Sequence, residues 1–320
     1  MNRVRKRIQL DELGEQSWQK YGITVAVLDS GISGHPDLLG KCMVFKDFVN
    51  QRRKQYDDNG HGTHVCGILC GSGEASKGKY RGISPSCRLV VCKVLDKNGD
   101  GSADVMLEAL QWLLVNHKKY DIRIINISVG IGKMHDKQKC KLLTEALERL
   151  WDAGVIIICA AGNKGPKPGS ISNIGGMQKV ITVGCYDDLE PQNCKENCER
   201  YSGRGPQNSS LRKPDLVAPG TGIVSCNYGF TRIISKEHLN QDTKVTCNVT
   251  AYENLYIPKT GTSMATPIVT GCVALLLQKE PYLNNEKVKE RLTFSAEDLG
   301  KPWNWQGWGM INVKNLLEIR

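Results

Sequence analysis

The chain carries, at residues 25–31, the sequence VAVLDSG, in which an apolar run ends in an aspartate followed by a Ser-Gly turn. The run begins at Ile23 and is almost entirely apolar, as expected of a strand buried on both faces. Similar runs occupy residues 88–95, 122–127, 155–160 and 180–183. Segments with helical periodicity lie between and around them, at residues 61–70, 103–116 and 137–152. This alternation predicts an α/β fold with a mostly parallel central sheet flanked by helices.

Length and composition limit the domain organisation. The 320 residues, 40% hydrophobic and 24% charged, suffice for one large domain or two small ones. No repeat and no Pro/Ser-rich linker divides them, so we expect a single domain over residues 1–320. Residues 228–258 are polar and lack helical periodicity, which predicts an inserted loop or hairpin near the functional site.

The charge and the apolar runs bear on partners and location. The formal net charge of +10 suits nucleic acid, an anionic membrane or acidic polypeptides. No aromatic-basic repeat or basic amphipathic helix accompanies it, so a solvated basic surface is favoured and no nucleic-acid partner is expected. No apolar run approaches the roughly 20 residues of a membrane span. The start, Met1–Arg7, does not lead into an apolar signal core, and we expect a cytoplasmic protein without membrane contact. The oligomeric state is left open.

The thirteen cysteines, an odd count, favour a reducing compartment over a disulfide framework. Many lie in apolar stretches, where a free thiol behaves as a small hydrophobe: Cys66, Cys70, Cys92, Cys159, Cys185 and Cys272. Cys194 and Cys198 share a polar loop, where they could pair or contribute to a metal site. No second cysteine pair stands nearby at ligand spacing, so we expect no metal.

Three polar residues stand where catalytic groups are usually placed. Asp29 ends a buried strand, His61 lies between two glycines at a helix start, and Ser263 heads a long apolar helix. A serine hydroxyl needs a base, and an imidazole needs a carboxylate to fix its tautomer. Asn163 follows another buried strand, where its amide could donate to an oxyanion. His64 could suggest a metal pair with a nearby cysteine, but no third ligand is evident and packing along the helix is favoured.

In chain order these blocks resemble the subtilisin-like serine peptidases, the S8 family. The resemblance covers nearly the whole chain and includes residues 35–38 (HPDL), 126–130 (NISVG), 214–220 (PDLVAPG) and 307–312 (GWGMIN). It implies a three-layer subtilisin-like fold and a serine endopeptidase. Asp29 would then orient and stabilise His61, His61 would act as general base and later as general acid, and Ser263 would attack the peptide carbonyl. The Asn163 amide and the Ser263 backbone N–H would form the oxyanion hole.

The resemblance also implies how a polypeptide substrate binds. An extended peptide would add as a strand between two segments that contain four of the expected binding residues: Gly99, Gly101, Ser128 and Gly130. The side chain before the scissile bond, P1, would enter a pocket walled by Gly130 and residues 160–162, Gly162 included, with Lys164 at its rim and Ser172 at its base. A lysine there predicts a preference for acidic or polar P1 side chains. The alternative is a solvated lysine of little influence.

Departures from the family pattern refine the prediction. Residues 70–82, where many secreted relatives have a calcium loop, carry lysines instead of oxygen ligands, so we doubt a calcium site there. The chemistry itself requires no cofactor. The chain shows no long prodomain, which fits the family's intracellular branch and a role in protein turnover or peptide maturation. A catalytically silent relative and a hydrolase of non-peptide amides or esters are the alternatives. The intact triad argues against the first, and the glycine-containing binding strands argue against the second.

Overall fold

A seven-stranded sheet lies at the centre of the computed structural model, which describes residues 1–320 except 15, 131–135, 189–196, 239–245 and 319–320. All its neighbouring strands are parallel, in the order β2-β3-β1-β4-β5-β6-β7. The strands are β1 (Thr24–Asp29), β2 (Cys42–Asp47), β3 (Arg88–Lys93), β4 (Ile122–Ile127), β5 (Ile156–Ala160), β6 (Ile181–Tyr186) and β7 (Leu216–Pro219). The expected parallel sheet is confirmed.

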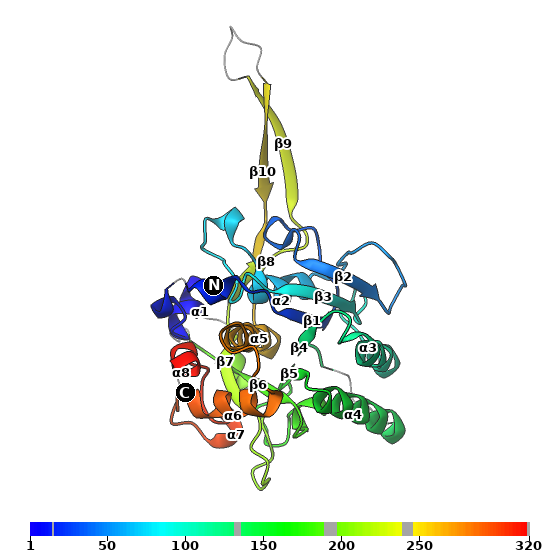
Figure 1. The fold of residues 1–320 in the computed structure, drawn as a ribbon, viewed down its shortest axis with the longest axis vertical. Helices are drawn as coiled ribbons and strands as arrows, with labels where there is room; N and C mark the ends of the chain where they lie inside the picture. The colour runs from blue at the N-terminus through cyan, green and yellow to red at the C-terminus, as the bar shows by residue number, and fades with distance from the viewer. Residues whose placement is uncertain (15, 131–135, 189–196, 239–245, 319–320) are drawn as a thin grey trace.

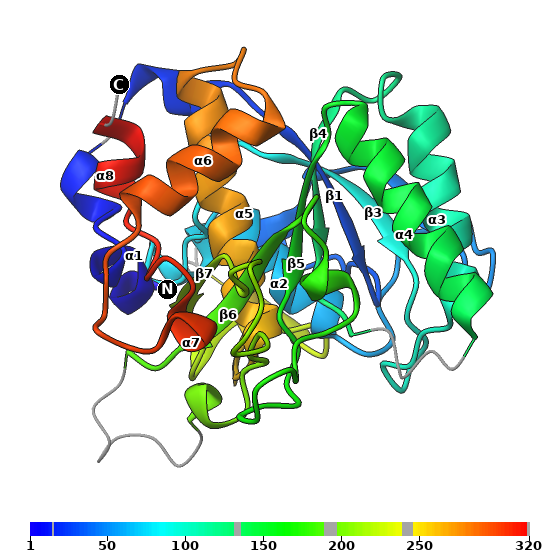
Figure 2. The same cartoon turned by 90° about the horizontal axis from the view of Figure 1, so that it is seen from below.

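Helices cover both faces of this sheet (Figure 2). α3 (Ala103–Asn116) and α4 (Lys137–Asp152) pack together on one face, and α2 (His61–Cys70) and α5 (Thr262–Lys279) pack together on the other. The shorter helices are α1 (Asn2–Arg7), α6 (Asn285–Ser295), α7 (Trp303–Gln306) and α8 (Val313–Glu318). Single 3₁₀ turns include Asp11–Leu13, Ser17–Lys20, Pro36–Leu38, Glu74–Ser76, Ile174–Gly176 and Cys198–Arg200. Across the described residues, no helix is both long and apolar enough to cross a bilayer.

The central strands are buried because they lie between two helical layers. Every residue of β1 and β5 is buried, which agrees with their almost uninterrupted apolar sequence. α5 is buried over nearly its whole length, since it packs against β4, β5, β6 and β7 as well as α2. Because all neighbouring strands are parallel, their carboxyl ends share one edge of the sheet. Functional groups of parallel sheets usually lie at this edge.

Residues 228–258 form most of an arm beside this edge. β8 (Ile223–Cys226) and β11 (Tyr256–Lys259) pair antiparallel at its base. Between them, β9 (Thr231–His238) and β10 (Thr246–Glu253) form a two-stranded antiparallel ribbon that projects from the body of the molecule (Figure 1). The chain then returns along β11 and enters α5 three residues later.

Candidate active site

Asp29 and His61 are in direct contact. Asp29 is the last residue of β1 and is fully buried. Its Oδ1 accepts a hydrogen bond from the Ser30 backbone N–H at 2.7 Å and lies 2.7 Å from His61 Nδ1. An ionised carboxylate only accepts hydrogen bonds, so Nδ1 carries the imidazole proton and Nε2 keeps a free lone pair. This tautomer is the one that a general base of the expected kind needs.

A second buried carboxylate, Asp57, fixes the turn that carries His61. Its two oxygens accept five hydrogen bonds of 2.6–3.1 Å, from Ser30 Oγ, the Thr63 hydroxyl and the backbone N–H groups of Asn59, Gly60 and Thr63. Burial alone would raise the pKa of Asp57, but these hydrogen bonds outweigh burial and hold the pKa below its usual value. Asp57 therefore stays ionised and organises the start of α2.

The glycines on either side of His61 are required by geometry. Gly60 caps α2 with φ 92°, in the left-handed region. Gly62 donates its N–H to Ser30 Oγ at 2.8 Å, and a Cβ at this position would lie 2.3 Å from the Gly31 carbonyl oxygen. A side chain at Gly62 would therefore push α2 away from the end of β1, where Asp29 lies.

Ser263 is the second residue of α5 and is half-buried. Gly261, with φ 149°, precedes the helix and donates its N–H to the Gly220 carbonyl at 2.9 Å, which ties the turn to the end of β7. In the described part of the chain, the Ser263 hydroxyl makes no hydrogen bond. The serine-to-histidine bond of the expected triad is thus not formed here, and such bonds often tighten only when substrate is bound.

His64 joins the helix of the candidate base to the strands that lead to the candidate nucleophile. Its Nε2 lies 3.0 Å from the carbonyl oxygens of both Ile223, in β8, and Ile257, in β11. Burial is the main reason that the pKa of His64 falls to about 3, so its imidazole is neutral and Nε2–H donates to these carbonyls. Its role here is to hydrogen-bond α2 to β8 and β11, whereas the sequence favoured packing along the helix.

Asn163 lies three residues beyond the end of β5 and contacts the start of α5. Its Oδ1 accepts hydrogen bonds from the Thr262 backbone N–H at 3.2 Å and the Thr262 hydroxyl at 2.9 Å. These two donors fix the orientation of the amide, because they require an oxygen at that position. The amide Nδ2 is left for another acceptor next to the first turn of α5.

The expected substrate-binding residues lie on loops at the same edge. Gly99, with φ 84°, and Gly101 follow β3, and the Lys97 carbonyl nearby accepts a hydrogen bond from Asn59 Nδ2 at 3.1 Å. Ser128 follows β4 and is held by Asn126 Nδ2 at 2.9 Å. The first segment is thus connected to the turn that precedes His61, and the second is held by its own strand.

Two features are found where the P1 side chain is expected to bind: a hydrogen bond from Ser172 and the exposed charge of Lys164. Gly162 adopts φ 90° next to Ser172, whose hydroxyl donates to the Ala160 carbonyl at 3.0 Å. Gly130 and Lys164 are both exposed. Any influence of Lys164 on a P1 side chain would therefore act through solvent.

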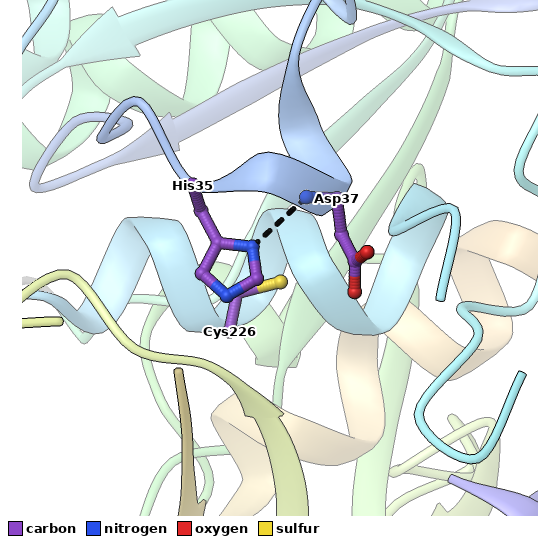
Figure 3. A group of neighbouring side chains, drawn as sticks. All are labelled: His35, Asp37 and Cys226. Atoms are coloured by element: carbon purple, nitrogen blue, oxygen red, sulfur yellow. Dashed lines mark hydrogen bonds between the residues drawn. The ribbon is translucent and has the colours of Figure 1, made fainter. Parts of the chain in front are cut away.

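One group of side chains in the described residues could hold a metal ion: His35, Asp37 and Cys226 (Figure 3). Their potential ligand atoms all lie within 4.8 Å of one another. His35 Nδ1 accepts from the Asp37 backbone N–H at 3.1 Å, so Nε2–H donates to the Leu255 carbonyl at 2.9 Å. Burial holds the pKa of Cys226 well above its usual value, so this ligand stays a neutral thiol. The group fits a hydrogen-bonded brace better than a metal centre, and it anchors the base of the arm.

Asp37 belongs to the same brace and to the HPDL block. Its carboxylate accepts from Tyr256 OH at 2.7 Å, Ser72 Oγ at 3.2 Å and the Ala75 backbone N–H at 3.0 Å. These donors from the chain itself occupy the oxygens that a cation would use. The residues present do not fit calcium at this place, and the expectation about cofactors stays a prediction.

The cysteine prediction was wrong at one position. Cys185, at the end of β6, forms a disulfide with Cys198 and is not a free thiol. The pairing is possible because Cys198 returns to the end of β6 from a loop 13 residues later, a proximity that the apolar setting of Cys185 does not reveal. Cys194, the other partner considered for Cys198, lies outside the described residues.

Comparisons with known proteins agree with this geometry. The subtilase family profile (peptidase S8) matches residues 20–309. The chain belongs to the subtilase family. By that membership it is an enzyme of the serine endopeptidase class, acting on polypeptides, and the predicted family is confirmed.

Individual relatives cover this subtilase almost completely. Serine protease AprX of Bacillus subtilis is 38% identical over 92% of this chain, which spans 66% of the AprX length. Subtilisin DY of Bacillus licheniformis is 29% identical, with 96% and 95% of the two chains covered. Among solved structures, sphericase superposes with a TM-score of 0.76 at 25% identity, with 97% of each chain covered. The expected subtilisin-like fold is confirmed.

Sequence reasoning missed the residues that support the site. Asp57 and Ser30 hold the His61 turn, and Thr262 orients Asn163. A signal for Asp57 exists in the sequence, since an aspartate three residues before a glycine-histidine helix start is a residue type that commonly caps exposed backbone N–H groups. Thr262 offers no comparable signal, because its partner is 99 residues away.

Proposed function

We propose that this subtilase cleaves peptide bonds through Asp29, His61 and Ser263, by way of an acyl-enzyme. The 2.7 Å contact between Asp29 Oδ1 and His61 Nδ1 carries the proposal, because it leaves Nε2 as a free base at the edge where α5 begins. His61 Nε2 takes the Ser263 hydroxyl proton as Oγ bonds to the scissile carbonyl carbon. Asp29 stabilises the imidazolium that results.

The negative charge that develops on the carbonyl oxygen needs preorganised donors. Two are available: the Ser263 backbone N–H in the first turn of α5, where helix N–H groups lack partners, and Asn163 Nδ2. His61 then protonates the leaving amine, and the C–N bond breaks. Water, deprotonated by the same Nε2, attacks the acyl-enzyme and releases Ser263. No step requires a metal or cofactor.

The acylation step is tested with a fluorophosphonate probe, which phosphonylates an activated serine and releases fluoride. We expect labelling of the intact protein and none of Ser263→Ala, with Ser209→Ala as a matched control that keeps the label. Ser209 lies in a loop outside the site. An unlabelled wild-type protein would indicate a silent relative. Labelling without casein cleavage would indicate a hydrolase of other amides or esters.

Oxyanion stabilisation is tested separately. Asn163→Ala should lower kcat by about 10²–10³, the loss known for the equivalent donor of subtilisin itself, with little change in KM. Asn163→Asp keeps the acceptor for Thr262 but removes the donor, so it should lose as much activity as Asn163→Ala.

We also propose that Lys164 favours acidic P1 side chains, supported by its place beside Gly162 and by the net charge of +10. Because Lys164 is exposed, the preference for Glu over Leu should be about fivefold or less, within the range of surface ion pairs. Matched peptides with Glu, Leu or Lys at P1, tested on wild type and Lys164→Gln, provide the measurement. Equal rates for Glu and Lys would refute the proposal.

For location we propose the cytoplasm, with protein turnover or peptide maturation as the role, as in the family's intracellular branch. The supporting observation is chemical: nine described cysteines are unpaired, seven of them buried, against the single described disulfide Cys185–Cys198, a kind of bond that is rare in the cytosol. Cell fractionation with antibody detection tests the location, and recovery from the culture medium alone would contradict it.

A further inference from the structure

Lys259 is a lysine near the candidate nucleophile in sequence that has no ion-pair or hydrogen-bond partner among the described residues. It is the last residue of β11, four residues before Ser263, and pairs with Ile223 of β8 through the backbone. Its side chain is half-buried, and within the described residues it forms no ion pair or hydrogen bond. Lys93 provides a contrast, because its buried Nζ has three acceptors, Asp58 Oδ1 among them.

The carboxylates whose charge acts on Lys259 are Asp57 and Asp29, and neither forms an ion pair with it. Asp57 accepts four hydrogen bonds from the His61 turn and one from Ser30 Oγ, and Asp29 Oδ1 is bonded to His61 and the Ser30 N–H. Of these carboxylate oxygens, only Asp29 Oδ2 has no hydrogen-bond partner among the described residues, and it is buried. Burial lowers the pKa of Lys259 more than the attraction of Asp57 and Asp29 raises it. A lysine ammonium that is shielded from water and has no ion-pair partner is stabilised more strongly by the carboxylate of a bound substrate than an exposed lysine is.

Lys259 lies in a different sheet from the segments expected to hold the acyl side of a substrate. The segments expected to hold the acyl side of the peptide follow β3 and β4, in the sheet. β8 and β11 form a separate sheet that packs against α2. From the same side, the Tyr228 ring contacts Gly60, directly before His61. This separation from the acyl-side segments points to the leaving-group side of the site for Lys259 and Tyr228.

We propose that Lys259 gives this peptidase a preference for an acidic side chain just after the scissile bond, at P1′ or P2′. The inference rests on the proposed function for the direction in which the peptide lies. It is separate from the Lys164 proposal, which concerns the residue before the bond. The preferred substrate class is then polypeptides with Asp or Glu on the leaving-group side.

The test uses matched peptides that differ only in Glu, Gln or Lys at P1′, and a second set that differs at P2′. For wild type we expect kcat/KM for Glu to exceed that for Gln by about tenfold in one of the two sets, more than an exposed pair would give. Lys259→Gln should reduce this ratio to about one, and Lys259→Glu should favour Lys over Glu. Lys118→Gln, with the same charge change on the exposed α3–β4 connection, should keep the wild-type ratio.

A binding measurement separates this inference from the proposed function. The Ser263→Ala chain is titrated with the same peptides, and their dissociation constants are compared by fluorescence anisotropy. Tighter binding of the Glu peptide that is lost in Lys259→Gln supports the inference even if no peptide is cleaved, a result that would refute only the peptidase proposal. A ratio below about twofold in both measurements, or one that survives in Lys259→Gln, overturns the inference.

Discussion

Replacing Asp57 by Asn tests whether this buried carboxylate organises the site. The amide oxygen can still accept from Ser30 Oγ, Asn59 N–H and Gly60 N–H, but the amide nitrogen then faces the Thr63 N–H, one donor against another. An orphaned buried N–H costs about 1–3 kcal/mol. The bonds that remain also become weaker, because they lose their charged acceptor. We expect the free energy of unfolding to fall by about 3 kcal/mol.

The assay is urea unfolding followed by circular dichroism, in the Ser263→Ala background so that self-digestion cannot interfere. Glu108→Gln, an exposed change of the same charge on α3, is the control. The pKa of Asp57 is depressed in the folded state, so its contribution is present above the unfolded-state pKa of about 3.9 and is lost as pH falls through the folded value. The difference between Asp57→Asn and its parent should therefore shrink on acidification.

Activity provides the second measurement. With Ser263 intact, Asp57→Asn should lower kcat by about tenfold or more, because small displacements of a catalytic group are costly and His61 begins the turn that Asp57 holds. An Asp57→Asn protein with a free energy of unfolding within about 0.5 kcal/mol of the Glu108→Gln control, and with wild-type kcat, would refute the reasoning.

Three further predictions concern the surroundings of the site, with stability again measured without the nucleophile. His64 has a pKa of about 3 when folded, so the unfolded chain takes up its proton first and stability declines as pH falls from about 6.5 toward 3; His64→Gln should make that decline shallower. Gly62→Ala should cost about 3 kcal/mol or more and abolish activity, because its Cβ would meet backbone at 2.3 Å, whereas Gly34→Ala, with open space around it, should be tolerated in thermal melts. Loss of the Cys185 disulfide, by reduction or as Cys185→Ser, should cost about 3 kcal/mol for a loop of this size, while Cys140→Ser, a free thiol, should leave the melting temperature unchanged.

The sequence predicted the inner strands of the sheet but not its edges. β1 and β5 are apolar throughout because helices cover both of their faces. β2 is an edge strand with exposed Met43 and Lys46, and its apolar run is short, covering only residues 42–45. β7 has only four residues and ends at Pro219, which gives too little sequence for a period to show.

The candidate site divides in the same way. Asp29, His61, Asn163 and Ser263 could be proposed from the sequence because each stands at or just after the end of a strand, or at the start of a helix, which is a local feature. The Asp29–His61 contact was correctly anticipated from the chemistry of an imidazole that needs a carboxylate. The partner of Cys185 was missed, because side-chain proximity across a loop leaves no mark in local composition.

By itself, the sequence determined the parallel α/β architecture and the family, and it supplied the candidate catalytic residues, because apolar runs, glycine turns and strand ends are properties of neighbouring residues. Only the tertiary structure decided which side chains support them. Asp57 accepts hydrogen bonds that hold the His61 turn, and His64 joins α2 to β8 and β11 across more than 150 residues. Lys259 is half-buried and has no ion-pair partner among the described residues. The physical reason is that hydrogen bonding and desolvation depend on groups that meet only after the chain has folded.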